Sequence, residues 1–221
     1  MLEPYTLVRS RRRTLALSVT ADATLVVRAP MRTPLFYIEE LIARKINWIR
    51  KAIVRMSRHP RRVVHKYIDG ESFLYLGQSY TLSIVKDAHN KLAFKDGFIL
   101  KTCEHRHARE LFTDWYKREA KEKITERVAR IARHTGLPYK SVRITSAKKR
   151  WGSCSSSGRL NFSWRLILAP LSVIDYVVAH ELAHLTHKNH SRAFWNKVQA
   201  IYPNYAESKA WLRHHEAALT L

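Results

Sequence analysis

One short segment, residues 180–190, constrains the fold more than any other part of the chain. It reads His-Glu-Leu-Ala-His-Leu-Thr-His-Lys-Asn-His, an HExxH motif followed six residues later by a further histidine. On a helix, His180 and His184 lie one turn apart on the same face, so both imidazoles reach one ion. His190 lies beyond the expected helix end. The segment therefore requires a helix that stops soon after His184 and a chain reversal that returns His190.

The residue types in this motif point to a catalytic metal site. Glu181 sits beside the first histidine and is better placed to take a proton from a metal-bound water than to bind the metal. Three protein ligands with one open position are the usual layout of a catalytic zinc site. The motif predicts one zinc ion (Zn2+) per chain, held by His180, His184 and His190, with Glu181 as general base.

His187 competes with His190 for the third position. Three histidines on consecutive turns would span about 10 Å at 1.5 Å per residue, too far for one ion with bonds of about 2 Å. Asn189 tolerates left-handed backbone and can help end the helix. We therefore favour His190 and expect His187 to be a second-shell or rim residue. The same spacing occurs in metzincins, but these need a methionine after the motif, and all three methionines here precede it.

The residues before the motif have the pattern of a buried helix. Pro170-Leu171-Ser172 precedes an apolar run, and Ser172 with Asp175 forms an acceptable capping box for a helix start. The two residues between the histidine ligands, Leu182 and Ala183, are apolar, as a buried metal helix needs.

The pattern of the whole chain predicts an α+β protein with two regions. We expect residues 1–103 to form a mainly β region with one helix. Segments 14–19 and 24–28, bounded by Ala21-Asp22, predict a hairpin. Residues 34–56 carry apolar side chains at helical spacing after Pro34. Asp96-Gly97 between two short apolar segments predicts a second hairpin.

We expect residues 104–221 to form a minimal zincin-like catalytic domain: a long helix, a small antiparallel sheet, the HExxH helix and C-terminal helices. The long helix spans about 105–135 and ends at Gly136 and Pro138. Strands follow near 142–145 and 159–168. Helices then run from Ser191 to Tyr202 and from about 205 to 219. An edge strand commonly lies above the metal in such sites and pairs with an extended peptide. Segment 159–168 is the candidate, with an ordinary sheet member as the alternative.

Charge is the unusual part of the composition. The chain has 40 Lys and Arg against 18 Asp and Glu, a net charge of +22. Such a field attracts polyanions, so we expect non-specific attraction to nucleic acid. No apolar run reaches the length of a membrane helix, no secretory signal is visible, and Cys103 and Cys154 need not pair. A cytoplasmic location, with no membrane partner, fits best.

Several segments carry a resemblance to a known family. They are Arg150-Trp151-Gly152-Ser153-Cys154-Ser155, Asn161, Trp164-Arg165-Leu166, Asp175-Tyr176-Val177-Val178, Asn189-His190-Ser191 and Phe194-Trp195. With the HExxH motif, this pattern resembles the YgjP-like metallopeptidase family, related to the SprT and WLM types of zinc peptidase. The resemblance is closest over 140–200. It implies that His180, His184 and His190 bind zinc and that Glu181 is the general base. Within the family, nucleotide pyrophosphate cleavage has also been attributed.

Three functional hypotheses follow. The first is a zinc metallopeptidase acting on extended peptides. The second is a zinc-dependent pyrophosphatase acting on a nucleotide polyphosphate such as a nucleoside triphosphate of the UTP type, which the charge would favour. The third is a non-enzymatic basic module associated with nucleic acid, against which an intact Glu181 argues. Arg150, His187 and Asn161 are candidates to stabilise a developing oxyanion.

Overall fold

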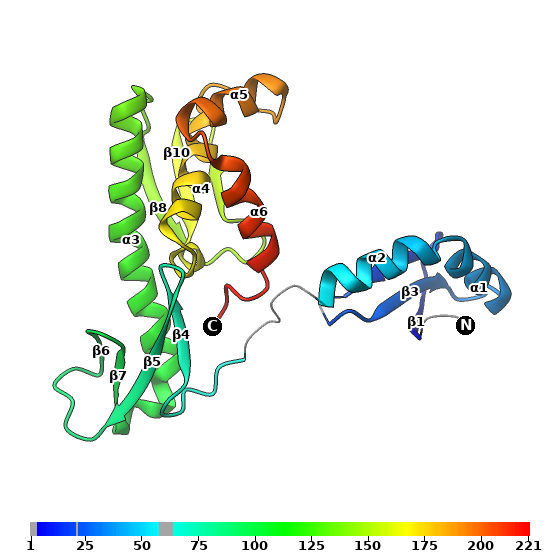
Figure 1. The fold of residues 1–221 in the computed structure, drawn as a ribbon, viewed down its shortest axis with the longest axis horizontal. Coiled ribbons are helices and arrows are strands. Elements are labelled where there is room, and N and C mark those ends of the chain that lie inside the picture. Colours follow the sequence, from blue (N-terminus) through cyan, green and yellow to red (C-terminus); the bar gives the residue numbers. More distant parts are fainter. Residues whose placement is uncertain (1–3, 21, 58–63) are drawn as a thin grey trace. The chain divides into compact units, whose positions relative to one another are not determined.

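The computed structural model describes residues 4–20, 22–57 and 64–221, and divides the chain into two compact units, Met1–Arg62 and Val63–Leu221. The α+β class is confirmed (Figure 1). This division differs from the boundary that the sequence suggested at 103/104. Phe73, Phe98 and Phe112, on either side of that boundary, belong to one buried core cluster, so the strands before it pack with the helix after it.

The first unit is a three-stranded sheet covered by two helices. Its elements are β1 (Tyr5–Ser10), β2 (Ala16–Val19), β3 (Leu25–Pro30), α1 (Leu35–Arg44) and α2 (Ile46–Ser57). The predicted hairpin is confirmed as the antiparallel pair β2–β3, although Ala21 of its turn lies outside the described residues. Strand β1, which we did not predict, pairs parallel with β3.

The single helix expected over residues 34–56 is instead two helices that meet at Lys45. Ile42 on α1 and Ile49 on α2 are both fully buried in the same cluster as the alternating residues of β3. Packing against the sheet thus overrides the continuous helical pattern. No glycine or proline marks this break in the sequence.

The second unit begins with a four-stranded sheet of order β4-β5-β7-β6. Its strands are β4 (Ser72–Tyr75), β5 (Gln78–Val85), β6 (Leu92–Phe94) and β7 (Phe98–Lys101). The second predicted hairpin is confirmed as β6–β7, with Phe94 opposite Phe98. The turn between β4 and β5 docks near the metal helix, because the N–H groups of Leu76 and Gly77 donate to the carbonyls of Ile167 and Leu168.

The rest of this unit follows the predicted order of long helix, small sheet, HExxH helix and C-terminal helices. Its elements are η1 (Thr102–His107), α3 (Ala108–Thr135), β8 (Ser141–Thr145), β9 (Gly152–Cys154), β10 (Arg159–Ser163), η2 (Trp164–Leu168), α4 (Leu171–Ala183), α5 (Arg192–Ile201) and α6 (Tyr205–His215). Gly136 ends α3 in the left-handed conformation, as expected. Among the described residues no helix has both the length and the apolarity needed to cross a membrane.

Two details of the small sheet differ from the prediction. The sheet is mixed rather than antiparallel, because β10 lies between β8 and β9 and pairs parallel with β8 and antiparallel with β9. The predicted strand 159–168 also ends at Ser163, and the apolar residues after it form the buried 3-10 turn η2. Because β10 is central, it is not the free edge near the HExxH helix, and β9 takes that place.

The long helix and the HExxH helix are joined by a partly buried ion pair. Arg127 of α3 donates two hydrogen bonds to the carboxylate of Asp175 on α4, and Arg130 contacts the same carboxylate at 3.2 Å. Asp175 is therefore an inter-helix anchor rather than part of the predicted capping box. Helix α4 begins after Pro170, no side-chain bond caps it, and the carbonyl of Ser172 accepts from Ser208.

Candidate metal centre

Helix α4 ends where the motif requires it to end. Its last residue is Ala183, and His184 occupies the C-cap position. The N–H groups of Leu185, Thr186 and His187 then bond back to the carbonyls of residues 182 and 183, which closes the final turn. The chain reverses over the next residues, and Ser191 begins α5 as its N-cap. Ser191 has the predicted cap position, but its side chain makes no cap bond.

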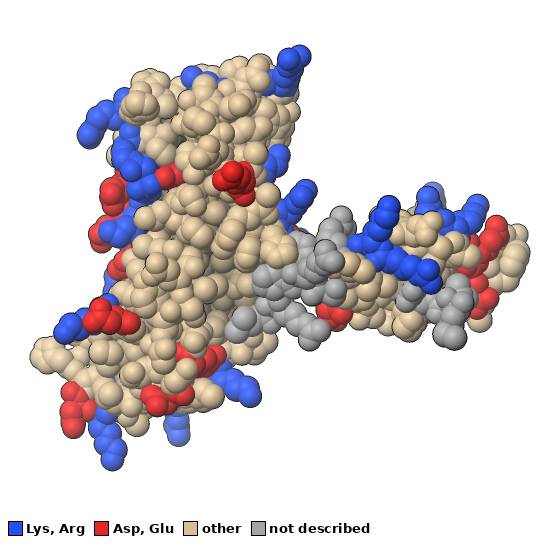
Figure 2. Space-filling model, viewed as in Figure 1, with Lys and Arg blue, Asp and Glu red and all other residues tan. Residues whose placement is uncertain are grey.

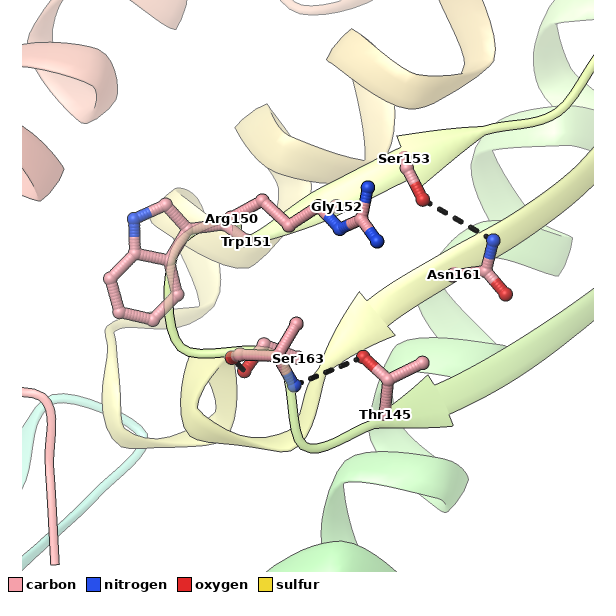
Figure 3. Close-up of a pocket in the computed structure, with 8 residues that line it drawn as sticks. Thr145, Arg150, Trp151, Gly152, Ser153, Asn161 and Ser163 are labelled. Atoms are coloured by element: carbon pink, nitrogen blue, oxygen red, sulfur yellow. Dashed lines mark hydrogen bonds between the residues drawn. The ribbon is translucent and has the colours of Figure 1, made fainter.

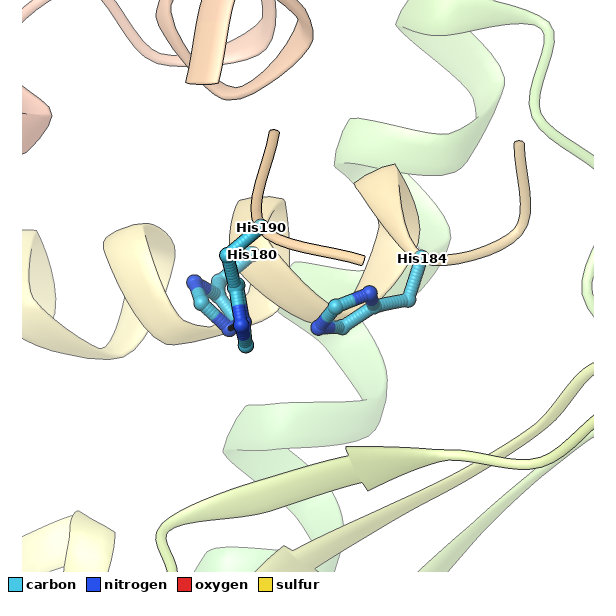
Figure 4. A group of neighbouring side chains, drawn as sticks. All are labelled: His180, His184 and His190. Carbon is cyan, nitrogen blue, oxygen red and sulfur yellow. Dashed lines mark hydrogen bonds between the residues drawn. The ribbon is translucent and has the colours of Figure 1, made fainter. Parts of the chain in front are cut away.

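This reversal brings the three predicted histidines together (Figure 4). One nitrogen from each of His180, His184 and His190 lies within 4.8 Å of the others. The Nε2 atoms of His180 and His190 are 3.1 Å apart. Two nitrogens bound at about 2.05 Å in tetrahedral geometry would be about 3.3 Å apart, so this separation suits a shared zinc ion.

The orientation of His184 is set by a backbone group. Its Nδ1 lies 2.9 Å from the carbonyl oxygen of His187, so Nδ1–H donates and Nε2 keeps its lone pair for a metal. The His187 ring instead contacts the hydroxyl of Thr186 at 2.9 Å. The contact of His187 with the ligand His184 is therefore made by its backbone carbonyl, and a role for its side chain stays a prediction.

Burial keeps the motif histidines neutral. The pKa of His180 is lowered to about 3. Burial is the largest cause, and the charges of His184, His190 and Lys209 add to it. Burial also lowers the pKa of His184, against the opposing effect of its bond to the His187 carbonyl. Neutral imidazoles are the protonation state that zinc binds, and imidazole is among its preferred ligands. The donor set therefore fits zinc.

Two aromatic side chains from the first turn of α5 pack against the three histidines. The ring of Phe194 is fully buried, and its centroid lies 4.5–4.9 Å from those of all three histidines. Trp195 stacks on His190, and the ammonium group of Lys209 lies 3.7 Å from the centroid of Trp195. We had taken Phe194 and Trp195 only as signs of family resemblance. Their position just after Ser191, about one helical turn from His190, is the sequence signal that could have predicted this packing.

Glu181 is enclosed beside the histidines. Its exposed fraction is 5%, and its Oε2 atom has no hydrogen-bond partner among the described residues. Burial raises the pKa of Glu181 to about 8, and the nearby Arg150 opposes the increase. A buried carboxyl group with a pKa of about 8 and no hydrogen-bond partner on Oε2 can accept and release a proton near neutral pH.

A glycine of β9 makes room for this carboxylate. A Cβ atom placed on Gly152 would lie 2.5 Å from Oε1 of Glu181 and 2.6 Å from its Cγ. Gly152 has no positive φ angle, so its lack of a side chain is required by this contact and not by backbone conformation. The sequence analysis did not identify this role, because the contact joins residues 29 positions apart.

The three oxyanion candidates lie in different places. Asn161 is next to Leu160 and Phe162, which are buried in the core, so its side chain points to the opposite face of the sheet, where it donates to Ser153. Gly152, by contrast, lies opposite Phe162 and faces Glu181. Asn161 therefore does not face the Glu181 side of the sheet. Arg150 remains near enough to influence the pKa of Glu181.

The match to a protein family agrees with this site. Residues 13–215 match the family described as YgjP-like, metallopeptidase domain. The chain belongs to this family. The membership confirms the resemblance seen in the sequence and implies a metal cofactor. The YgjP-like match covers both structural units, so the first unit is part of what defines the family.

Solved structures similar to part of this YgjP-like chain include two metallopeptidase zymogens, and the comparison with curated proteins found no match. The metallopeptidase zymogen of Pyrococcus abyssi abylysin is 20% identical, with a TM-score of 0.38, over 44% of this chain and 99% of that chain. The metallopeptidase zymogen of Methanocaldococcus jannaschii jannalysin is 20% identical, with a TM-score of 0.37, over 41% of this chain and 93% of that chain.

Proposed function

We propose that the chain is a zinc-dependent metallopeptidase. His180, His184 and His190 would hold one zinc ion, and Glu181 would be the general base. The observation that carries the proposal is the convergence of three histidine nitrogens within 4.8 Å beside a buried carboxyl group that has no partner on Oε2. Family membership supports peptide-bond cleavage as the reaction.

The roles of the side chains follow from their positions. Bound zinc supplies Lewis acidity, which lowers the pKa of water and polarises a substrate carbonyl. Glu181 would accept the proton from the attacking water and return it to the amine that leaves. The carbonyl of His187 holds the His184 ring, and Gly152 gives the carboxyl group of Glu181 its space. Arg150 opposes the rise in the pKa of Glu181, but its side chain lines the same hollow as Ser153 and Asn161, on the other face of the sheet, so no side chain is assigned to the oxyanion.

The substrate is proposed to be an extended or unfolded segment of polypeptide. Strand β9 is an edge of its sheet, and its first residue contacts Glu181. An extended peptide could add to this edge through backbone hydrogen bonds, which places a peptide bond beside the general base. This proposal transfers the substrate-pairing role from segment 159–168 to β9.

Cleavage of a nucleotide polyphosphate is the second candidate. The same ligands and general base could serve that reaction, and a net charge of +22 favours an anionic substrate. A structural, non-catalytic metal site is less well supported, because such a site needs no buried carboxyl group beside its ligands.

One screen separates these candidates. Purified protein is incubated with an unfolded casein-like protein and, separately, with nucleoside triphosphates, each with and without a chelator. We expect cleavage of the protein only, lost with the chelator and absent in Glu181→Gln. Cleavage of triphosphates alone would replace the peptidase proposal with the pyrophosphatase, and cleavage of neither by zinc-loaded protein would contradict both.

A further inference from the structure

The small sheet lies in the longest stretch of the chain that has no acidic residue. Residues 127–174 contain ten Lys and Arg and no Asp or Glu. The first two of these cations, Arg127 and Arg130, contact the carboxylate of Asp175, which lies just outside the stretch. The stretch includes all of β8, β9 and β10. An all-cationic sheet is not needed for the proposed peptidase chemistry, so it calls for a separate explanation.

The outer face of this sheet is polar as well as cationic. Arg143 of β8, Asn161 of β10 and Ser153 of β9 lie side by side in the register, next to the pair Ser163–Thr145, whose hydroxyls already donate to the carbonyls of Ala147 and Phe162. Their neighbours along β10 point into the core, so these side chains share the face turned away from Glu181. Guanidinium, amide and hydroxyl groups are all hydrogen-bond donors, and together they suit an acceptor-rich ligand.

One hollow lies on this face, and a second adjoins it at the β8 edge of the sheet; both are lined by Thr145. The smaller, about 190 Å³, is lined by Arg150, Trp151, Ser153 and Asn161 among others. Figure 3 shows the Arg150 side chain reaching across the sheet toward Ser153 and Asn161. The larger hollow, about 460 Å³, lies between helix α3 and strand β8, the other edge of the sheet. We call the two together the sheet-face groove.

The larger hollow holds cations that no acid neutralises. Arg118, Lys121 and Arg143 are exposed, and within the described part of the chain none forms an ion pair. Lys117 in the same hollow does pair with Asp114, at 3.4 Å. Figure 2 shows acidic and basic side chains interleaved along the side of the second unit formed by α3, where Lys123 contacts Glu122 and Glu126. Arg118 and Lys121 belong to the same helix but have no such contact among the described residues.

We propose that the sheet-face groove binds single-stranded nucleic acid. Exposed cations that track a groove, with an aromatic side chain beside them, are what proteins use to hold a strand through its phosphates and bases. Arg118, Lys121 and Arg143 would contact successive phosphates. The Asn161 amide would contact a base in the smaller hollow, which Trp151 also lines. An acidic peptide would use the cations but has no base to place against Asn161.

The test is the binding of the full chain to fluorescently labelled 20-nucleotide single strands of DNA and of RNA, followed by anisotropy over a series of salt concentrations. The triple variant Arg118→Gln, Lys121→Gln, Arg143→Gln removes the exposed cations of the larger hollow. Its matched control, Lys66→Gln, Lys86→Gln, Lys95→Gln, removes three exposed cations elsewhere in the same unit. Both variants lower the net charge from +22 to +19, so overall charge cannot distinguish them.

We expect the groove variant to bind at least about tenfold more weakly than the control. Its slope of log affinity against log salt should be smaller by about 2, since each phosphate contact on a single strand contributes about 0.7. A second variant, Lys148→Gln with Lys149→Gln, should weaken binding in the same direction. Equal weakening in the groove variant and the control would overturn the proposal in favour of diffuse attraction. Competition by polyglutamate as effective as that by the oligonucleotide, at equal charge, would overturn it in favour of an acidic protein partner.

Discussion

Replacing Gly152 by alanine should disable the general base without touching a metal ligand. The new Cβ would lie 2.5 Å from Oε1, 2.6 Å from Cγ and 2.8 Å from Cδ of Glu181. Ordinary contact between such atoms is about 3.5 Å, so the carboxyl group must move by about 1 Å. Glu181 is only 5% exposed and has little space for that movement. Misplacement of a catalytic group by about 1 Å can lower turnover on the order of 100-fold.

The assay is turnover of an unfolded protein substrate by zinc-loaded Gly152→Ala, with zinc content and melting temperature measured on the same sample. Ser153→Ala is the matched control, because Ser153 follows on the same strand but points to the other face of the sheet. We expect bound zinc in both variants and a loss of turnover only in Gly152→Ala. Full turnover in Gly152→Ala would refute the close contact, and loss of zinc would show that β9 supports the ligands instead.

Three further predictions concern the metal centre and the helix that carries it. Burial raises the pKa of Glu181 from 4.5 to about 8, so in metal-free protein its contribution to stability is lost as pH rises between those values. Metal-free Glu181→Gln should therefore be more stable than metal-free wild type at pH 7, on the order of 2 kcal/mol, and the difference should vanish near pH 4 in denaturant titrations. His190→Ala should weaken zinc binding sharply, while His187→Ala should spare it, because the carbonyl of His187 makes the contact; the opposite order in metal titrations would contradict this geometry. Asp175→Ala should lower the free energy of unfolding by about 3 kcal/mol, since it leaves Arg127 partly buried without its carboxylate; a change below about 1 kcal/mol would show that the ion pair contributes little.

The order of elements in the catalytic region was predictable because local patterns specify it. The apolar stripe and Gly136 define α3, and the HExxH spacing defines the face of α4. The return of His190 was also predictable, since one ion cannot bind histidines spread over three helical turns. In each case the interaction that determines the structure lies within a few residues of the pattern.

The parts that sequence could not supply depend on contacts between distant segments. Nothing near Phe73 or Phe98 indicates that they share a core with Phe112, so the sequence predicted a boundary at 103/104, whereas the compact units divide after Arg62. The position of β10 between β8 and β9 is set by pairing between strands that are apart in the sequence. As a result, the free edge of the sheet is β9 and not segment 159–168.

The central claim is that zinc held by three histidines, with Glu181 as base, cleaves peptide bonds. The most direct test adds zinc stepwise to metal-free wild type and to metal-free Glu181→Gln, while zinc binding and turnover of an unfolded protein are measured together. We predict that wild-type turnover reaches its plateau at about one zinc per chain. Glu181→Gln should bind the same amount of zinc and turn over about 100-fold to 10,000-fold more slowly. Turnover that is independent of zinc, or undiminished in Glu181→Gln, would contradict the mechanism.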